Sequence, residues 1–173
     1  MKKKLFILLF LFLTIKNTSF SFQSQDLHHY YKSSIDTTKI ENDFLLINLL
    51  KENLSFEYLM KSSFSKKRRF KNNIYDIKIK NYEWTFSNNI DKVKYLSASG
   101  NKILLYALIK SPNFLIGEKI SVGNLKSIIA QKLKVSTLSD LVIISDIEGS
   151  GQIILSFKNE YLNKIEYQVL YLD

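Results

Sequence analysis

The residues best suited to chemistry are three carboxylates near the end of the chain, Asp140, Asp146 and Glu148. Asp146 and Glu148 follow a predicted strand with one residue between them, so both side chains could share a face. Carboxylate oxygens bind Ca²⁺, and paired carboxylates also serve hydrolases. The spacing is not that of an EF-hand, and acidic residues commonly border hairpin turns. A cation site or a small hydrolase is therefore the alternative to a structural role.

Other catalytic groups are scarce. Cysteine is absent, which excludes a disulfide framework, a thiolate zinc site and a cysteine nucleophile. The two histidines, His28 and His29, are adjacent, so they share no face on which to hold one metal ion. Gly149 and Gly151 lie between two predicted strands, as in a hairpin turn rather than a phosphate loop. The sequence predicts a protein that is not an enzyme and has no cofactor.

A basic segment lies in the first half of the chain, where residues 64–73 read FSKKRRFKNN. Residues 61–80 contain eight lysines or arginines and one acid, a charge of +7, while the whole chain carries +9. Four consecutive cations repel one another, so we expect a solvated loop rather than a strand or a tight helix. The alternative is a site that contacts an acidic protein or, weakly, anionic lipid. The candidate contact residues are Lys66, Lys67, Arg68, Arg69 and Lys71.

An aromatic stripe follows the basic segment. Tyr82, Trp84 and Phe86 alternate with polar residues, which predicts a strand with one aromatic face. Such a face usually belongs to the core, but beside a basic loop it could also stack on a ligand. Trp84, the single tryptophan, is the candidate aromatic contact.

The N-terminus is typical of a secretory signal peptide. Lys2, Lys3 and Lys4 precede nine consecutive apolar residues, 5–13, and small polar residues follow. Cleavage after Ser21 would leave about 150 residues, enough for one domain. An uncleaved anchor or a buried first helix is the alternative. Without a cysteine for lipid attachment we expect a periplasmic or secreted protein, of bacterial type by its composition. Export argues against nucleic acid as a partner.

Hydrophobic periodicity predicts the elements of the mature chain. A helix is expected from Ile40 to Leu50, capped by Asp36, Thr37 or Thr38, with a second short helix over 55–60. Strands are expected at 75–79, 82–86, 93–97 and, fully buried, 103–109. A helix capped by Asn124 and strands at 141–145, 152–157 and 164–172 complete the chain.

This order predicts an α+β fold, with helices packed on one face of an antiparallel meander sheet. The predicted organisation is a signal peptide (1–21), a polar N-terminal arm (22–39) and one α+β domain (40–173). Its halves, 40–110 and 111–173, would be two diverged helix–meander repeats, because the order of elements recurs while the sequence does not.

The stretch EKISVGNLKSIIAQKL resembles the entry of BamE/SmpA-like and β-lactamase-inhibitor-like domains, over about residues 110–173. Ile120, Val122 and Gly123 precede a helix with Ile129 and Leu133, as in the family pattern. The family's Ser or Thr cap would fall near Leu125, and many relatives are lipoproteins, whereas this chain lacks cysteine. The resemblance implies a non-catalytic periplasmic or secreted binding module and transfers no site residues.

These observations predict an exported, non-catalytic module that binds a protein partner in the cell envelope or outside the cell. The alternative is an exported immunity or inhibitor protein that neutralises a toxin or an enzyme. A small hydrolase that uses the three carboxylates is the third interpretation.

Overall fold

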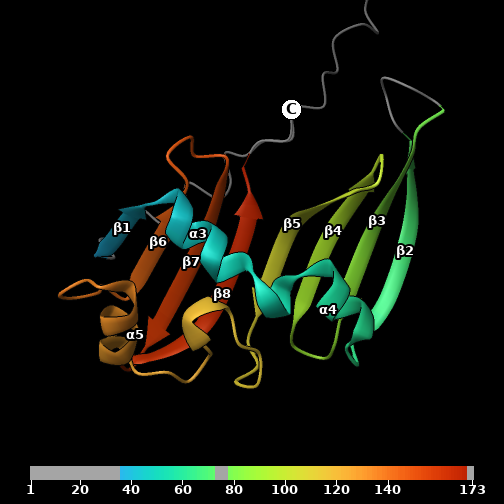
Figure 1. Ribbon diagram of the computed structural model, residues 1–173. Helices are drawn as coiled ribbons and strands as arrows, with labels where there is room; N and C mark the ends of the chain where they lie inside the picture. Colours follow the sequence, from blue (N-terminus) through green and yellow to red (C-terminus); the bar gives the residue numbers. More distant parts are fainter. Residues whose placement is uncertain (1–35, 73–77, 171–173) are drawn as a thin grey trace, which may run out of the picture. The chain divides into compact units, whose positions relative to one another are not determined.

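The computed structural model describes residues 36–72 and 78–170, which belong to one compact unit (Figure 1). Eight strands form a single sheet in the order β1-β6-β7-β8-β5-β4-β3-β2. The strands are β1 (Thr37–Glu41), β2 (Ser65–Asn72), β3 (Lys80–Ser87), β4 (Lys92–Ala98), β5 (Asn101–Ile109), β6 (Leu141–Ser145), β7 (Gly151–Lys158) and β8 (Tyr161–Val169). The helices are α3 (Asp43–Leu50), η1 (Glu52–Leu54), α4 (Phe56–Lys61), η2 (Gly117–Lys119) and α5 (Lys126–Leu133).

The sheet is mixed, so the predicted antiparallel meander covered by helices is wrong. Strands β2 to β5 form one meander and β6 to β8 another, and β5 pairs with β8 to join them. Edge strand β1 runs parallel to β6, with Ile40 opposite Ile144. Eight strands span about 34 Å across the sheet, whereas an eight-residue helix is about 12 Å long. The short helices therefore cannot form a full layer over this sheet.

The predicted first helix begins too early, because its first two residues, Ile40 and Glu41, belong to strand β1. Thr38 and Ile40 lie in β1, because β-branched side chains suit a strand paired with β6. Helix α3 begins later, where the Asn42 side chain accepts a hydrogen bond of 2.9 Å from the Leu45 amide as N-cap. The helical spacing of Phe44 and Ile47 predicts that both side chains are buried, which is also wrong, since they are 75% and 53% exposed.

One hydrophobic core lies between the sheet and the helices. The fully buried row from Phe86 through Val93 and Ala107 follows the pairing of β3, β4 and β5. The helices contribute buried side chains to the same cluster: Leu46, Leu49, Leu54, Leu59, Ile129 and Leu133. This face of the sheet is thus the apolar one, and the opposite face carries the alternate residues of each strand.

The other predicted elements agree with the structure to different degrees. Helix α4 and the turns that join β4 to β5, β6 to β7 and β7 to β8 are confirmed. Strand β5 is only partly buried, since Ile103 is 41% exposed. Asn124 does not cap α5; its side chain accepts a hydrogen bond of 3.0 Å from the Ser121 amide. The predicted strand at 75–79 lies mostly outside the described residues, and Lys78 is in a turn.

Candidate functional site

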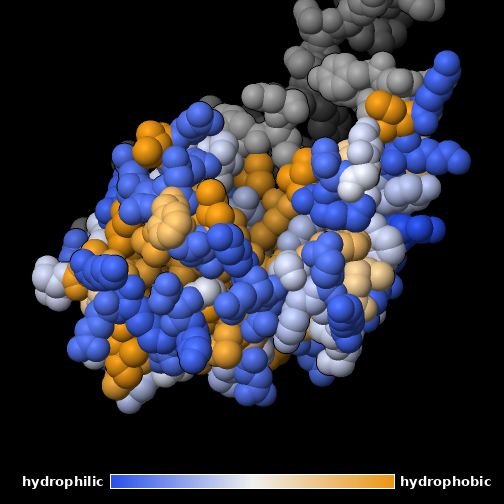
Figure 2. Space-filling model, in the orientation of Figure 1, coloured by the Kyte–Doolittle hydropathy of each residue, from blue (hydrophilic) through white to orange (hydrophobic). Residues whose placement is uncertain are grey.

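The basic segment forms β2, an edge strand whose eight residues are all exposed. The prediction of a loop is therefore wrong. Every β2 residue pairs with β3 in an unbroken antiparallel register, from Ser65 opposite Ser87 to Asn72 opposite Lys80. Successive side chains of a strand point to opposite faces, so the four consecutive cations divide between two solvated faces. This division weakens their repulsion, and pairing with β3 stabilises the strand. Figure 2 shows hydrophilic side chains along this edge, at the right of the view.

On the helix-bearing face, β2 places a cation over two aromatic rings. Arg68 lies opposite Trp84 in the register. Its guanidinium carbon is 4.7 Å from the centre of the Tyr82 ring and 5.5 Å from that of the Trp84 ring. Phe70 packs edge-on against Tyr82 and remains 56% exposed. The two kinds of sequence-predicted contact, basic and aromatic, therefore share one surface.

The aromatic stripe of β3 is divided between the core and this surface. Phe86 is fully buried, whereas Trp84 and Tyr82 are partly exposed. The Phe56 ring of α4 contacts both Trp84 and Phe86, with centroids 5.6 and 5.5 Å away. The core interpretation holds for Phe86, while Trp84 reaches from the core to the edge.

The opposite face of β2, β3 and β4 carries a group of cations that we call the basic face. Thr85 pairs with both Lys67 and Lys94, which places these two lysines on the same side of the sheet. One acid, Glu83, lies among them, with its carboxylate 3.8 Å from Lys71 Nζ and 4.0 Å from Lys94 Nζ. The members of the basic face are Lys67, Arg69, Lys71, Lys92 and Lys94.

The cations of the basic face are incompletely neutralised. Lys67 and Arg69 make no side-chain hydrogen bond or ion pair with another residue of the described ranges.

The sequence interpretation missed Lys92 and Lys94. Their alternation with Val93 and Tyr95 was the available signal, because it places both lysines on the face opposite the core.

The outer edge of β2 is free within the part of the chain that the structure describes. The strand pairs only with β3, and no backbone hydrogen bond joins it to another described segment. In an antiparallel pair, alternate residues direct their N–H and C=O groups away from the partner strand. Half of the β2 peptide groups are thus directed outward.

The three candidate carboxylates do not form one site. Asp140 precedes β6 and Asp146 follows it, so an extended chain of about 20 Å separates them. Asp140 instead binds Lys126 Nζ at 2.7 Å, and Glu160 binds the same ammonium group at 2.9 Å. The three carboxylates therefore do not meet at one point of the structure.

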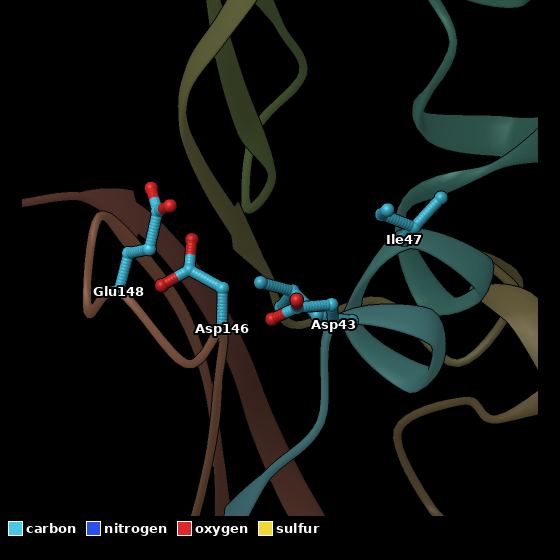
Figure 3. Close-up of a pocket in the computed structure, with 5 residues that line it drawn as sticks. Asp43, Ile47, Asp146 and Glu148 are labelled. Carbon is cyan, nitrogen blue, oxygen red and sulfur yellow. The ribbon is translucent and has the colours of Figure 1, made fainter.

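Asp146 and Glu148 border a hollow of about 290 Å³ between the β6–β7 hairpin and α3 (Figure 3). Asp43 and Ile47 line its other side. Burial raises the pKa of the Asp146 carboxyl, but hydrogen bonds from Ser150 and the following amides outweigh it, and the net pKa is lowered. Asp43 accepts a hydrogen bond of 2.8 Å from the Ile147 amide. Asp43 and Asp146 therefore stabilise the β6–β7 hairpin by accepting hydrogen bonds from it.

Within residues 36–72 and 78–170, no group of three or more metal-ligating side chains is arranged to hold a metal ion. In the same ranges, no helix has the length and apolar character needed to cross a membrane. The predicted signal peptide and both histidines lie outside the described residues.

Comparison with protein-family models, curated proteins and solved structures finds no significant match to this chain.

Proposed function

We propose that this chain is an exported, non-catalytic interaction module that binds an acidic partner protein through the basic face and β2. The observation that supports this most directly is the charge of the basic face, where five cations share one side of the sheet with a single carboxylate, that of Glu83. Export is expected from the N-terminal sequence, and it places the surface among extracytoplasmic partners.

Electrostatics of this kind determines which partner binds and how fast. A single exposed ion pair contributes only about 0.2–1 kcal/mol, so recognition requires several cations to act together. Neighbouring like charges also attract an anionic partner from a distance, and salt screens that attraction over about 8–10 Å. We therefore expect binding that weakens steeply as the salt concentration rises.

The test compares two triple variants that remove the same charge. One replaces Lys67, Arg69 and Lys71 by Ser, and the matched control replaces the exposed residues Lys61, Lys110 and Lys158 by Ser. Binding of a short polyglutamate peptide is measured by fluorescence anisotropy at several salt concentrations. Thermal unfolding of each variant verifies that the protein remains folded.

We expect the basic-face variant to bind about 10-fold or more weakly and with a flatter salt dependence, while the control resembles wild type. Equal losses in both variants would show that only net charge matters, and this result would contradict the proposal. Tight binding to phosphatidylglycerol vesicles without binding to the peptide would replace the partner protein by a lipid surface.

A further inference from the structure

We infer that the outer edge of β2 accepts an extended acidic segment of the partner protein as a ninth strand of the sheet. This inference rests on the proposed function and adds how the partner is held. Strand addition at a sheet edge obtains its affinity from backbone hydrogen bonds and its specificity from alternate side chains.

The geometry of β2 suits strand addition. Its eight residues pair with β3 without a bulge, whereas the pairs β4–β5 and β7–β8 each contain a register shift. It also contains no proline, so every residue retains its amide donor. The other edge, β1, has only five residues. Natural proteins protect edges by shortness, bulges, proline or charged side chains, especially lysine. Of these, β2 has only the charged side chains, which repel a strand of like charge but attract an acidic one.

The charges of β2 select the occupant. Lys67, Arg69 and Lys71 follow one another at every second position on one face. An added strand with acidic residues at alternate positions would place each carboxylate beside one of these cations, because cross-strand neighbours are about 4.5–5.5 Å apart. A second copy of this chain is disfavoured, since pairing β2 with β2 would bring two rows of cations together.

The helix-bearing face of β2 suits the side chains of the added strand that lie between its acidic residues. Phe70 is 56% exposed, and Arg68 lies over the rings of Tyr82 and Trp84. An apolar side chain of the added strand would cover Phe70 there and remove apolar surface from water. The expected recognition pattern is therefore acidic and apolar residues in alternation.

The probe is a peptide of about nine residues with capped ends in which glutamate alternates with valine, a usual strand length. A matched peptide has proline in place of the central valine; it keeps every negative charge but cannot complete the ladder. A third peptide has lysine in place of glutamate. Affinity is measured by fluorescence anisotropy, and exchange of the β2 amide hydrogens is followed by NMR with and without each peptide.

We expect the acidic peptide to bind at least 10-fold more tightly than the proline and lysine peptides. Alternate amides of β2 that exchange rapidly in the free protein should then exchange at least 10-fold more slowly. The remaining β2 amides, which are directed toward β3, provide the internal control in the same sample.

Several outcomes would overturn the inference. Equal binding of the acidic and proline peptides, with no new protection on β2, would show charge recognition without strand addition and would leave the proposed function intact. Protection of β2 that grows with protein concentration alone would identify a second copy as the occupant. If neither the acidic peptide nor polyglutamate binds more tightly to wild type than to the basic-face variant, the proposed function fails as well.

Discussion

Arg68 and Trp84 face each other across β2 and β3, with the guanidinium carbon 5.5 Å from the centre of the indole ring. The pair joins the charged edge of the sheet to the core, because Trp84 also contacts Phe56 of α4. Since Trp84 is the single tryptophan, its fluorescence reports on this edge.

The first prediction uses this fluorescence. At constant ionic strength, the ratio of iodide to caesium quenching should be higher for Trp84 than for free N-acetyltryptophanamide, because the cations of β2 concentrate anions near the ring. The Arg68→Met variant should lower iodide quenching about twofold. Lys158→Met is the control, since Lys158 on β7 is four strands away from β3. A ratio in wild type equal to that of N-acetyltryptophanamide would contradict the cationic environment.

The second prediction concerns Asp91, a buried carboxylate at the β3–β4 turn. It accepts hydrogen bonds of 2.8 and 2.9 Å from the amides of Lys110 and Ser111, and a third of 2.9 Å from the Asn88 side chain. Burial raises its pKa, but these hydrogen bonds outweigh burial and lower the pKa below the ordinary value of 3.8. The Asp91→Asn variant should lower the free energy of unfolding by about 1–3 kcal/mol at neutral pH.

The pH dependence of this loss has a definite sign. Because the folded pKa lies below the unfolded one, the stabilisation is fully present above about pH 4 and disappears as the pH falls through the folded pKa. Urea unfolding of wild type and variant should therefore converge in acid. A difference that stays constant down to acidic pH would refute the assignment. Asp140→Asn, at a carboxylate 67% exposed, should change stability much less.

The third prediction concerns Tyr95, which is 6% exposed and donates a hydrogen bond from its hydroxyl to the carbonyl oxygen of Leu54. Burial is the largest cause of its raised pKa, so the hydroxyl keeps its proton at neutral pH. Tyr95→Phe leaves that carbonyl unpaired and should cost about 1–2 kcal/mol in urea unfolding. Tyr161→Phe, at a 51% exposed residue, should cost less than about 0.5 kcal/mol. Similar losses of unfolding free energy in both variants would show that the hydrogen bond from Tyr95 to Leu54 does not stabilise the fold.

The fourth prediction concerns Gly117 in η2, where the chain passes close to α3. A Cβ atom at this residue would overlap the backbone carbonyl of Asn48 and lie 2.9 Å from the Cα of Leu49. Because both obstacles belong to the backbone, Gly117→Ala must push η2 and α3 apart. We expect a loss of about 1–3 kcal/mol or more in thermal or urea unfolding. Wild-type stability of this variant would show that the two segments are less closely packed.

Local patterns predicted those elements whose side chains alternate between core and solvent. The sequence of β3 identifies its buried face, because Phe86 recurs with Trp84 and Tyr82 at every second position. The same reasoning failed at Ile40, where β-branched residues within a helical pattern belong to a strand paired with distant β6. Likewise, the distance between Asp140 and Asp146 depends on the strand between them and cannot be deduced from composition.

The sequence by itself determined the location of the positive charge, the absence of cysteine chemistry and the alternation of most strands, because each is a property of adjacent residues. Only the tertiary structure decided that the basic segment is a strand, that it ends the sheet, and that Arg68 meets Trp84. Pairing with β3 fixes the basic segment as a strand, which the local sequence does not specify because its charges suit any solvated extended chain. Contacts between residues distant in sequence thus turned a charged stretch into an edge with two distinct faces.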